Sequence, residues 1–176
     1  MSYVLSVLGL ISMICASLTK GEKMKRILFF VFCGNFLVAT SYLVAGSGIN
    51  GAAACYIGSI MSIVTYFFDS KNKPLPLWVI AINIASVIAV NIWASGLSPL
   101  GILIIIASLT FVMCIGQKNG AKYRFWTIVN MLLWCTYDVL SKSYAALFTH
   151  VSLLVFTVIG MLIHDRKRVI KYTFDE

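Results

Sequence analysis

Seven long apolar runs alternate with short polar separators along the chain. They cover approximately residues 3–19, 27–45, 51–68, 77–95, 99–116, 125–141 and 145–163. Each run is long enough to cross a bilayer core of about 30 Å as an α-helix. The pattern therefore predicts an all-α integral membrane protein with seven transmembrane helices.

The separators differ in charge from one side of the predicted bundle to the other. The first, third and fifth separators and the C-terminal tail hold 4, 2, 3 and 4 of the 14 Lys and Arg residues. The opposite side holds only Lys142. Since cytoplasmic loops of membrane proteins are enriched in Lys and Arg, we expect the N-terminus outside and the C-terminus in the cytoplasm. Pro74 and Pro76 in the third separator prevent a continuous helix there.

Composition supports a membrane protein and argues against other classes. The chain has 176 residues, of which 60% are hydrophobic and 11% charged, whereas soluble domains carry about 25% charged residues. The net charge of +8 does not indicate nucleic acid, because the basic residues adjoin predicted spans. The expected partners are the lipid bilayer and a small-molecule solute. All five cysteines lie in apolar runs and none forms a CxxC pair, so we expect neither disulfides nor a metal site.

The two halves of the chain show a weak internal repeat. An offset of 95 positions aligns residues 26–68 with 121–163 and places Asn35 on Asn130 and Tyr42 on Tyr137. Each half also has the same order of spans, basic loop and short turn, which predicts two parallel triple-helix bundles joined by a linker helix (3+1+3). The expected divisions are a first repeat, a linker loop and helix, a second repeat and a cytoplasmic tail, at 1–68, 69–96, 97–164 and 165–176.

Three stretches carry a family resemblance: GSGINGAAACYIGSIMSIVTYF, FWTIVNMLLWCTYDVLSKSY and the basic HDRKR. Through them the chain resembles the YgjV-type bacterial inner-membrane proteins, and its 3+1+3 order is similar to the SWEET, PQ-loop and PnuC-like transporter superfamily. The resemblance implies a seven-helix bundle of two triple-helix units that conducts a solute across the bacterial inner membrane. Many superfamily members have a proline hinge in the first helix of each repeat, which this chain lacks.

The sixth run has an unusually polar face. Asn130, Trp134 and Asp138 are spaced by four residues and share one side of a helix, with Tyr137 beside them. At ~1.5 Å per residue, Trp134 lies about 15 Å into the span, whereas tryptophan usually prefers the interfaces. We expect these residues to bind a flat, polar solute.

The repeat places Asn35 and Asn130 opposite each other at the interface where transporters of repeated architecture bind their substrates. Two interpretations remain open for the pair: the amides line a pore, or they join helices by hydrogen bonds worth about 0.6 kcal/mol each.

Asp138 is the most deeply placed acid, and three interpretations remain open for it. It pairs with Lys142 one turn away, or it binds substrate or passes protons, or it hydrogen-bonds His150 in the seventh run. Because histidine titrates near neutral pH, a coupled Asp138–His150 pair would act in gating or in proton-linked transport.

The most concrete hypothesis is a transporter of a small polar metabolite, such as a sugar, nucleoside or vitamin-like compound. It works by alternating access between the two triple-helix bundles. The alternative is a non-transporting receptor or assembly protein built on the same, sealed bundle. No GxSxG, HExxH or Walker motif is present, so we expect neither an enzyme nor a cofactor. Two fused units need no partner subunit, although a homo-oligomer is compatible with the sequence.

Overall fold

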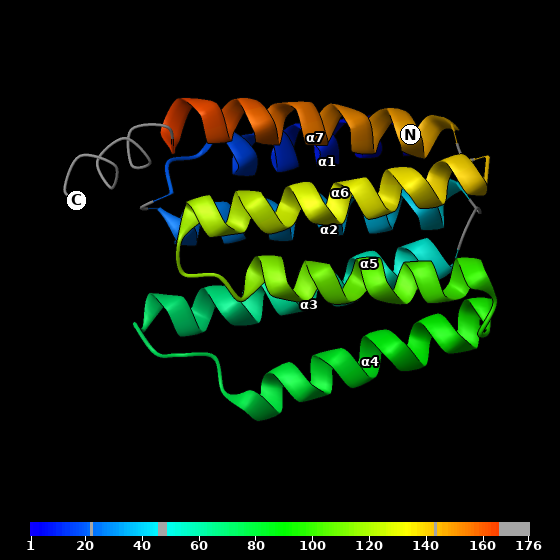
Figure 1. The fold of residues 1–176 in the computed structure, drawn as a ribbon, viewed down its shortest axis with the longest axis horizontal. Helices are drawn as coiled ribbons and strands as arrows, with labels where there is room; N and C mark the ends of the chain where they lie inside the picture. The colour runs from blue at the N-terminus through cyan, green and yellow to red at the C-terminus, as the bar shows by residue number, and fades with distance from the viewer. Residues whose placement is uncertain (22, 46–48, 143, 166–176) are drawn as a thin grey trace, which may run out of the picture.

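The computed structural model describes residues 1–21, 23–45, 49–142 and 144–165. Within them the chain is all-helical and has no strand (Figure 1). The seven helices are α1 (Ser2–Leu18), α2 (Met24–Ala45), α3 (Ile49–Ser70), α4 (Leu77–Ser95), α5 (Pro99–Ile115), α6 (Gly120–Leu140) and α7 (Tyr144–His164). The predicted all-α class is therefore confirmed. Part of the GSGIN turn, Ser143 and residues 166–176 of the expected tail lie outside the described residues.

Three of the described helices are long and apolar enough to cross a membrane: Met24–Ala45, Ala52–Ser70 and Ala146–His164. Three more segments are apolar but shorter: Ser2–Leu18, Leu77–Trp93 and Pro99–Ile115. The remaining helix, α6, carries Lys122, Arg124 and Asp138, which reduce its apolar character. The crossing of the bilayer by all seven helices stays a prediction.

The outer surface of the bundle is apolar. Large hydrophobic side chains are exposed on every helix, for example Val7, Phe36, Ile60, Ile82, Ile106, Leu132 and Val155. Such a surface would be unfavourable in water and suits a hydrocarbon solvent. The polar residues of the helices are mostly the buried ones, as expected when lipid surrounds the protein.

Local sequence sets several helix ends. Ser98 caps α5 by accepting a hydrogen bond from the Gly101 backbone N–H at 3.1 Å, and Pro99 occupies the first turn, where its missing N–H is tolerated. Asn119 caps α6 in the same way through the Ala121 N–H at 2.8 Å. Gly96 ends α4 with φ of +63°, a conformation that favours glycine.

The helices pack as two layers closed into a ring. One layer is α1–α2–α3 and the other is α5–α6–α7, with α1 packed on α7 and α3 packed on α5 (Figure 1). Helix α4 lies outside this ring, against α3 and α5. Helices α2 and α6 occupy the middle of their layers, so the residues of interest on α6 lie on a central helix.

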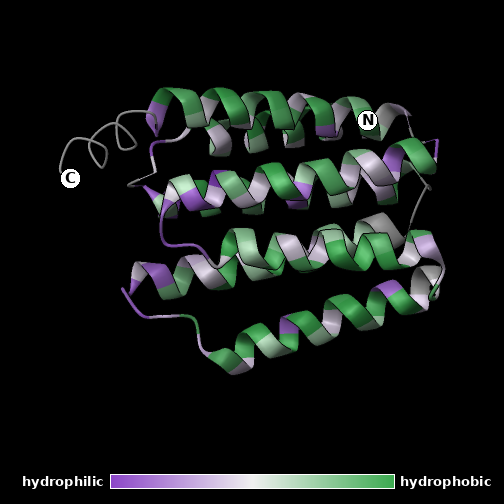
Figure 2. Ribbon diagram, in the orientation of Figure 1, coloured by the Kyte–Doolittle hydropathy of each residue, from purple (hydrophilic) through white to green (hydrophobic). Residues whose placement is uncertain are grey.

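The bundle has two chemically different ends. We call one the basic end: it holds the connections after α1, α3 and α5, with residues 19–21, 23, 71–76 and 116–119. The other, the far end, holds residues 96–98, 141 and 142. Figure 2 shows hydrophilic residues gathered at the basic end and hydrophobic ones along the helices. Helix α1 begins at the far end and α7 ends at the basic end.

The hydrophobic core lies toward the basic end. Its buried members come from six helices: Ala16, Met24, Ile27, Leu28, Val31, Met61, Val79, Cys114, Ile115 and Tyr123. Ile27 and Ile115 have no exposed surface, and Leu28 is also buried. This packing closes the interior of the ring on the basic side.

Candidate functional site

An aspartate and a histidine meet near the far end. Asp138 lies on α6 and is 1% exposed. Its Oδ2 atom lies 2.6 Å from Nδ1 of His150 on α7. Since adjacent antiparallel helices bring the end of α6 beside the start of α7, the chain direction already places these residues at the same level. The carboxylate and the imidazole are therefore joined by a short hydrogen bond between α6 and α7.

Aromatic rings cover this pair. The Trp134 indole stacks on the His150 imidazole with ring centroids 5.4 Å apart and an interplanar angle of 24°. Tyr137 meets Trp134 edge-on, with centroids 5.7 Å apart. Trp134, Tyr137 and Asp138 are gathered because spacings of three and four residues fall on one helix face. We call Trp134, Tyr137, Asp138 and His150 the far-end cluster.

The far-end cluster extends toward the opposite layer. Tyr42 on α2 lies within electrostatic range of Asp138, of Tyr137 and of Cys55 on α3. Tyr42, Trp134 and Tyr137 are each only partly buried, and the His150 side chain is 22% exposed. The far end therefore gathers polar and aromatic side chains that are only partly buried, whereas the hydrophobic core fills the bundle toward the basic end.

Asn130 is fully engaged with the neighbouring helix. It is 1% exposed, and its Nδ2 atom donates to the Ala107 carbonyl oxygen at 2.5 Å and to Thr110 Oγ1 at 2.8 Å. Both acceptors belong to α5. Asn130 thus makes interhelical hydrogen bonds of the kind expected from the packing interpretation.

Asn35 differs from Asn130. It is also buried, at 7% exposure, but its Nδ2 atom has no hydrogen-bond partner among the described residues. The amide lies beside Gly58 of α3, with Nδ2 3.5 Å from the position that a Cβ would take. A buried donor without a partner is costly. An oxygen atom of a solute or a water molecule that accepted a hydrogen bond from this amide would therefore bind favourably.

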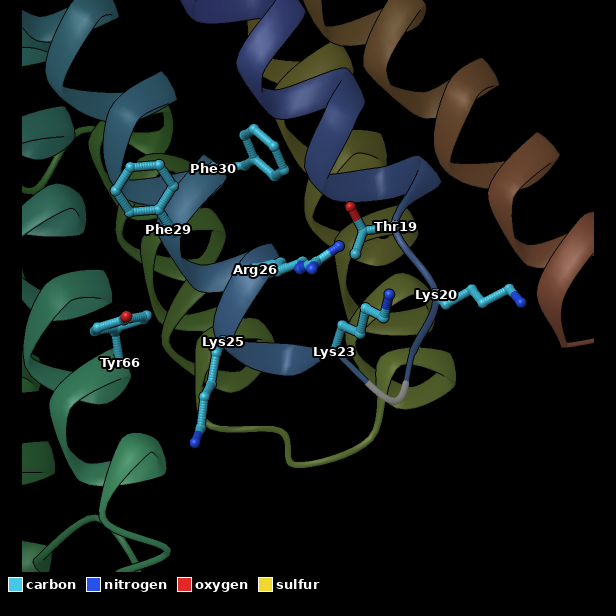
Figure 3. Close-up of a pocket in the computed structure, with 8 residues that line it drawn as sticks. All are labelled: Thr19, Lys20, Lys23, Lys25, Arg26, Phe29, Phe30 and Tyr66. Atoms are coloured by element: carbon cyan, nitrogen blue, oxygen red, sulfur yellow. The ribbon is translucent and has the colours of Figure 1, made fainter.

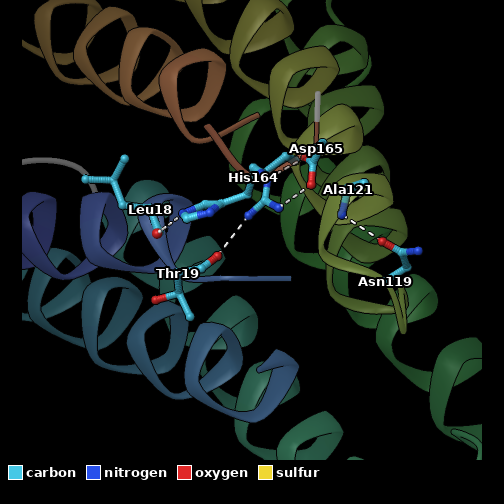
Figure 4. A network of polar contacts seen from close by, with 7 residues as sticks. Leu18, Thr19, Asn119, Ala121, His164 and Asp165 are labelled. Atoms are coloured by element: carbon cyan, nitrogen blue, oxygen red, sulfur yellow. Dashed lines mark hydrogen bonds and ion pairs between the residues drawn. The ribbon is translucent and has the colours of Figure 1, made fainter. Parts of the chain in front are cut away.

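The structure shows a second polar site, at the basic end, that sequence reasoning missed. The Arg124 side chain has no exposed surface. Its Nε and Nη2 atoms donate to both carboxylate oxygens of Asp165, at 2.8 and 2.7 Å, and Nη1 donates to the Thr19 carbonyl at 2.9 Å (Figure 4). His164 Nε2 donates to the Leu18 carbonyl at 2.8 Å. We call these five residues the basic-end network.

The basic-end network has a simple physical basis. The last carbonyl groups of a helix lack partners within the helix, and they form the negative end of its dipole. Here those of α1 accept hydrogen bonds from Arg124 of α6 and from His164 at the end of α7. The fork of an Arg side chain also matches a carboxylate in two parallel hydrogen bonds. The network therefore ties the end of α1 to both α6 and α7.

Close backbone contacts accompany this network. A Cβ on Gly120 would overlap the Gly21 backbone, and one on Gly160 would overlap the Ser17 carbonyl oxygen. The Ser17 and Thr157 hydroxyls lie 3.0 Å apart, linking α1 to α7. Small residues allow helices to approach this closely. The signal in the sequence was the placement of Arg124 and Asp165 at the same level of adjacent helices.

The sequence also led us to expect neither a metal site nor disulfide bonds. The structure has no group of three or more His, Cys, Asp or Glu side chains that could hold a metal ion within the described ranges. Cys15, Cys33, Cys55, Cys114 and Cys135 are all free thiols.

The chain was compared with protein families, curated proteins and solved structures, and only the families gave a match. No curated protein and no solved structure matches the chain. The model of one family, Imp-YgjV, described as bacterial inner membrane protein, matches residues 3–168. That match covers nearly the whole chain, including the far-end cluster and the basic-end network, and the protein therefore belongs to the Imp-YgjV family of bacterial inner membrane proteins.

Proposed function

We propose that this protein transports a small polar metabolite, such as a sugar, nucleoside or vitamin-like compound, across the bacterial inner membrane. The observation that carries the proposal is the buried Asp138 carboxylate, which is hydrogen-bonded to His150 within an apolar bundle. Ionisable residues inside membrane helices are expensive and mark substrate or proton pathways. A purely structural bundle would gain little from such a pair.

The chemistry of the far-end cluster suits a ring-containing solute. Trp134 offers an apolar face, Tyr137 offers a hydroxyl group, and the Asp138 carboxylate accepts hydrogen bonds from hydroxyl or N–H groups. His150, bonded to Asp138, supplies a titratable group for proton coupling. Asn35, whose amide nitrogen has no partner, is the next polar group along the proposed path.

The contrast between the two ends supports alternating access. The hydrophobic core and the basic-end network close the basic side, whereas the far-end cluster is partly exposed. In the proposed cycle, solute enters from the far end, and the α1–α2–α3 and α5–α6–α7 units then separate at the basic end. Helix α4 serves as the linker between these units.

Flux into proteoliposomes tests the proposal. A panel of labelled sugars, nucleosides and vitamins is offered to wild-type protein with and without an imposed pH gradient. We expect Asp138→Asn to lower the flux of the transported compound by about tenfold, the loss expected from one charge-assisted hydrogen bond of ~1.5 kcal/mol. Coupling to the pH gradient is also expected to disappear.

Thr136→Val is the matched control, because Thr136 lies on the exposed side of α6 and bonds only its own helix, through Leu132. This variant is expected to transport like the wild type. The transport proposal is wrong if no compound moves faster than into empty liposomes, or if Asp138→Asn leaves the flux unchanged.

The alternative function is a receptor or assembly protein with a sealed interior. The hydrogen bonds of Asn130 to α5 favour it, since they use the amide for packing. In that case a compound from the panel would bind and raise the melting temperature without crossing the membrane. The flux assay and a thermal-shift assay on the same panel therefore distinguish the two functions.

A further inference from the structure

A groove at the basic end is lined by cations. It has a volume of about 530 Å³ and lies between the α1–α2 connection and α3 (Figure 3). Four of its eight lining residues are basic: Lys20, Lys23, Lys25 and Arg26. None of the eight is acidic. The four basic residues are exposed, so the groove presents a concentrated positive charge to a bound molecule.

The cations of the groove are arranged around a free space. In Figure 3, Lys23 and Arg26 extend toward Thr19, while Lys20 and Lys25 extend to the sides. Lys25 Nζ reaches the Ser70 carbonyl at the end of α3, at 3.4 Å. An adjoining cavity of about 500 Å³ adds Lys118 and one acid, Asp69. The surroundings of the groove therefore keep a clear positive excess.

The other side of the groove is aromatic. Phe29, Phe30 and Tyr66 line it, and Phe29 is 48% exposed. Phe29 follows Arg26 by three residues on α2, which places it about 4–5 Å deeper along the helix axis at ~1.5 Å per residue. Because α2 is apolar enough to span a membrane, the cations lie at the level of headgroups and the rings begin at the level of acyl chains.

We propose that this groove binds an anionic phospholipid from the leaflet at the basic end. Lys23 and Arg26 contact the phosphate, and an acyl chain lies along Phe29 and Tyr66. Basic pockets between membrane helices bind anionic headgroups. A free phosphate ion would use the cations but gain nothing from the exposed ring of Phe29, so the two-part lining favours a lipid.

The groove is also joined to the basic-end network. Thr19 lines the groove, and its carbonyl oxygen accepts a hydrogen bond from Arg124. A lipid that holds the α1–α2 connection in place therefore stabilises the closed basic end as well. Lipid binding to the folded protein raises the melting temperature, because a ligand that binds only the folded state stabilises it.

The test is a thermal-shift titration of the purified full-length protein in a neutral detergent. Phosphatidylglycerol, phosphatidylcholine and inorganic phosphate are added separately. We expect phosphatidylglycerol to raise the melting temperature, and the other two to have little effect. Lys23→Gln and Arg26→Gln are each expected to weaken the phosphatidylglycerol response about fivefold, as ~1 kcal/mol per charge predicts.

Lys71→Gln and Lys73→Gln are the matched controls, because they remove the same charge at the same end but outside the groove. They should respond to phosphatidylglycerol like the wild type. Phe29→Ser keeps every cation and is expected to weaken lipid binding while leaving the protein folded.

Three results would overturn the proposal. Equal losses in groove and control variants would mean attraction to the general surface charge. An equal shift with inorganic phosphate would mean a site for a free anion. No shift with phosphatidylglycerol in the wild-type protein would mean that the groove binds neither lipid headgroup nor anion.

Discussion

Asn35 and Asn130 show how two like residues differ in a membrane interior. The sequence alignment of the two halves pairs them, and both are buried. Asn130 donates two hydrogen bonds to α5, whereas the Asn35 amide nitrogen has none. The sequence predicted polar positions on the central helices, but it left open which amide serves packing and which is available to a solute.

This difference predicts opposite effects on stability. Asn130→Leu is expected to lower the free energy of unfolding by about 0.6–1.7 kcal/mol, the range for hydrogen bonds between membrane helices. Asn35→Leu is expected to leave it unchanged or to raise it, because a buried donor without a partner is removed. Unfolding in detergent with increasing denaturant measures both variants.

The same variants separate stability from binding. Asn35→Leu should weaken binding of the transported solute although the protein is no less stable. A loss of stability in Asn35→Leu equal to that in Asn130→Leu would contradict the assignment of a free amide to Asn35.

At the scale of elements, the contact between α1 and α7 closes the ring. The Ser17 and Thr157 hydroxyls meet there, and Gly160 leaves space for the Ser17 carbonyl oxygen. The apolar runs at residues 3–19 and 145–163 predicted that both segments are helices. They did not predict this contact, because the two helices lie at opposite ends of the chain and neither run specifies its partner.

A methyl group at Gly160 tests the contact. Gly160→Ala is expected to lower the free energy of unfolding by about 1–3 kcal/mol, as overpacking does, because the added Cβ would overlap backbone that cannot rotate away. Gly116→Ala is the control, since a Cβ there would meet only its own helix at 3.3 Å. The close approach of α1 to α7 is refuted if both variants melt at the wild-type temperature.

At the scale of the whole molecule, the two ends of the bundle differ in the residues that line them. The basic end combines a hydrophobic core with the bidentate Arg124–Asp165 pair. The far end is lined by partly exposed aromatic and ionisable residues. In the proposed cycle the two units separate at the basic end, and the hydrogen bond from Arg124 to the Thr19 carbonyl is a contact between them that this separation would break. Asp165 holds the Arg124 side chain in place through its two hydrogen bonds.

Removing the Asp165 carboxylate is expected to loosen Arg124 from the Thr19 carbonyl and so to expose the core. In a protein that keeps Cys114 as its single cysteine, Asp165→Asn should speed maleimide labelling of Cys114 by about tenfold, which corresponds to a shift of ~1.4 kcal/mol in the closed-to-open equilibrium. Cys114 is 2% exposed in the structure, so its labelling reports opening. The labelling rate is measured by mass spectrometry.

Asp69→Asn provides the control, because it makes the same change of charge at the same end without touching Arg124. It should leave the labelling rate of Cys114 as in the wild type. Equal rates in all three proteins would show that Asp165, acting through Arg124, does not help to hold the basic end closed.

The sequence alone determined the all-helical class and the approximate bounds of the helices, because these depend on local properties: apolar runs, polar separators and prolines. It also singled out Trp134, Tyr137, Asp138 and His150 as polar residues of interest, since a polar group in an apolar run is visible in one dimension. Spacings of three and four residues further predicted that the first three share a helix face.

Only the tertiary structure decided the partners of these groups. Of the three interpretations of Asp138, the structure places its carboxylate on His150, and it assigns Arg124 to the carbonyl end of α1 and to Asp165. Sequence reasoning treated Arg124 as a loop charge that sets orientation, because its burial depends on helices that are distant in the chain. Which neighbour satisfies a buried charge is set by packing, and packing is a property of the whole bundle.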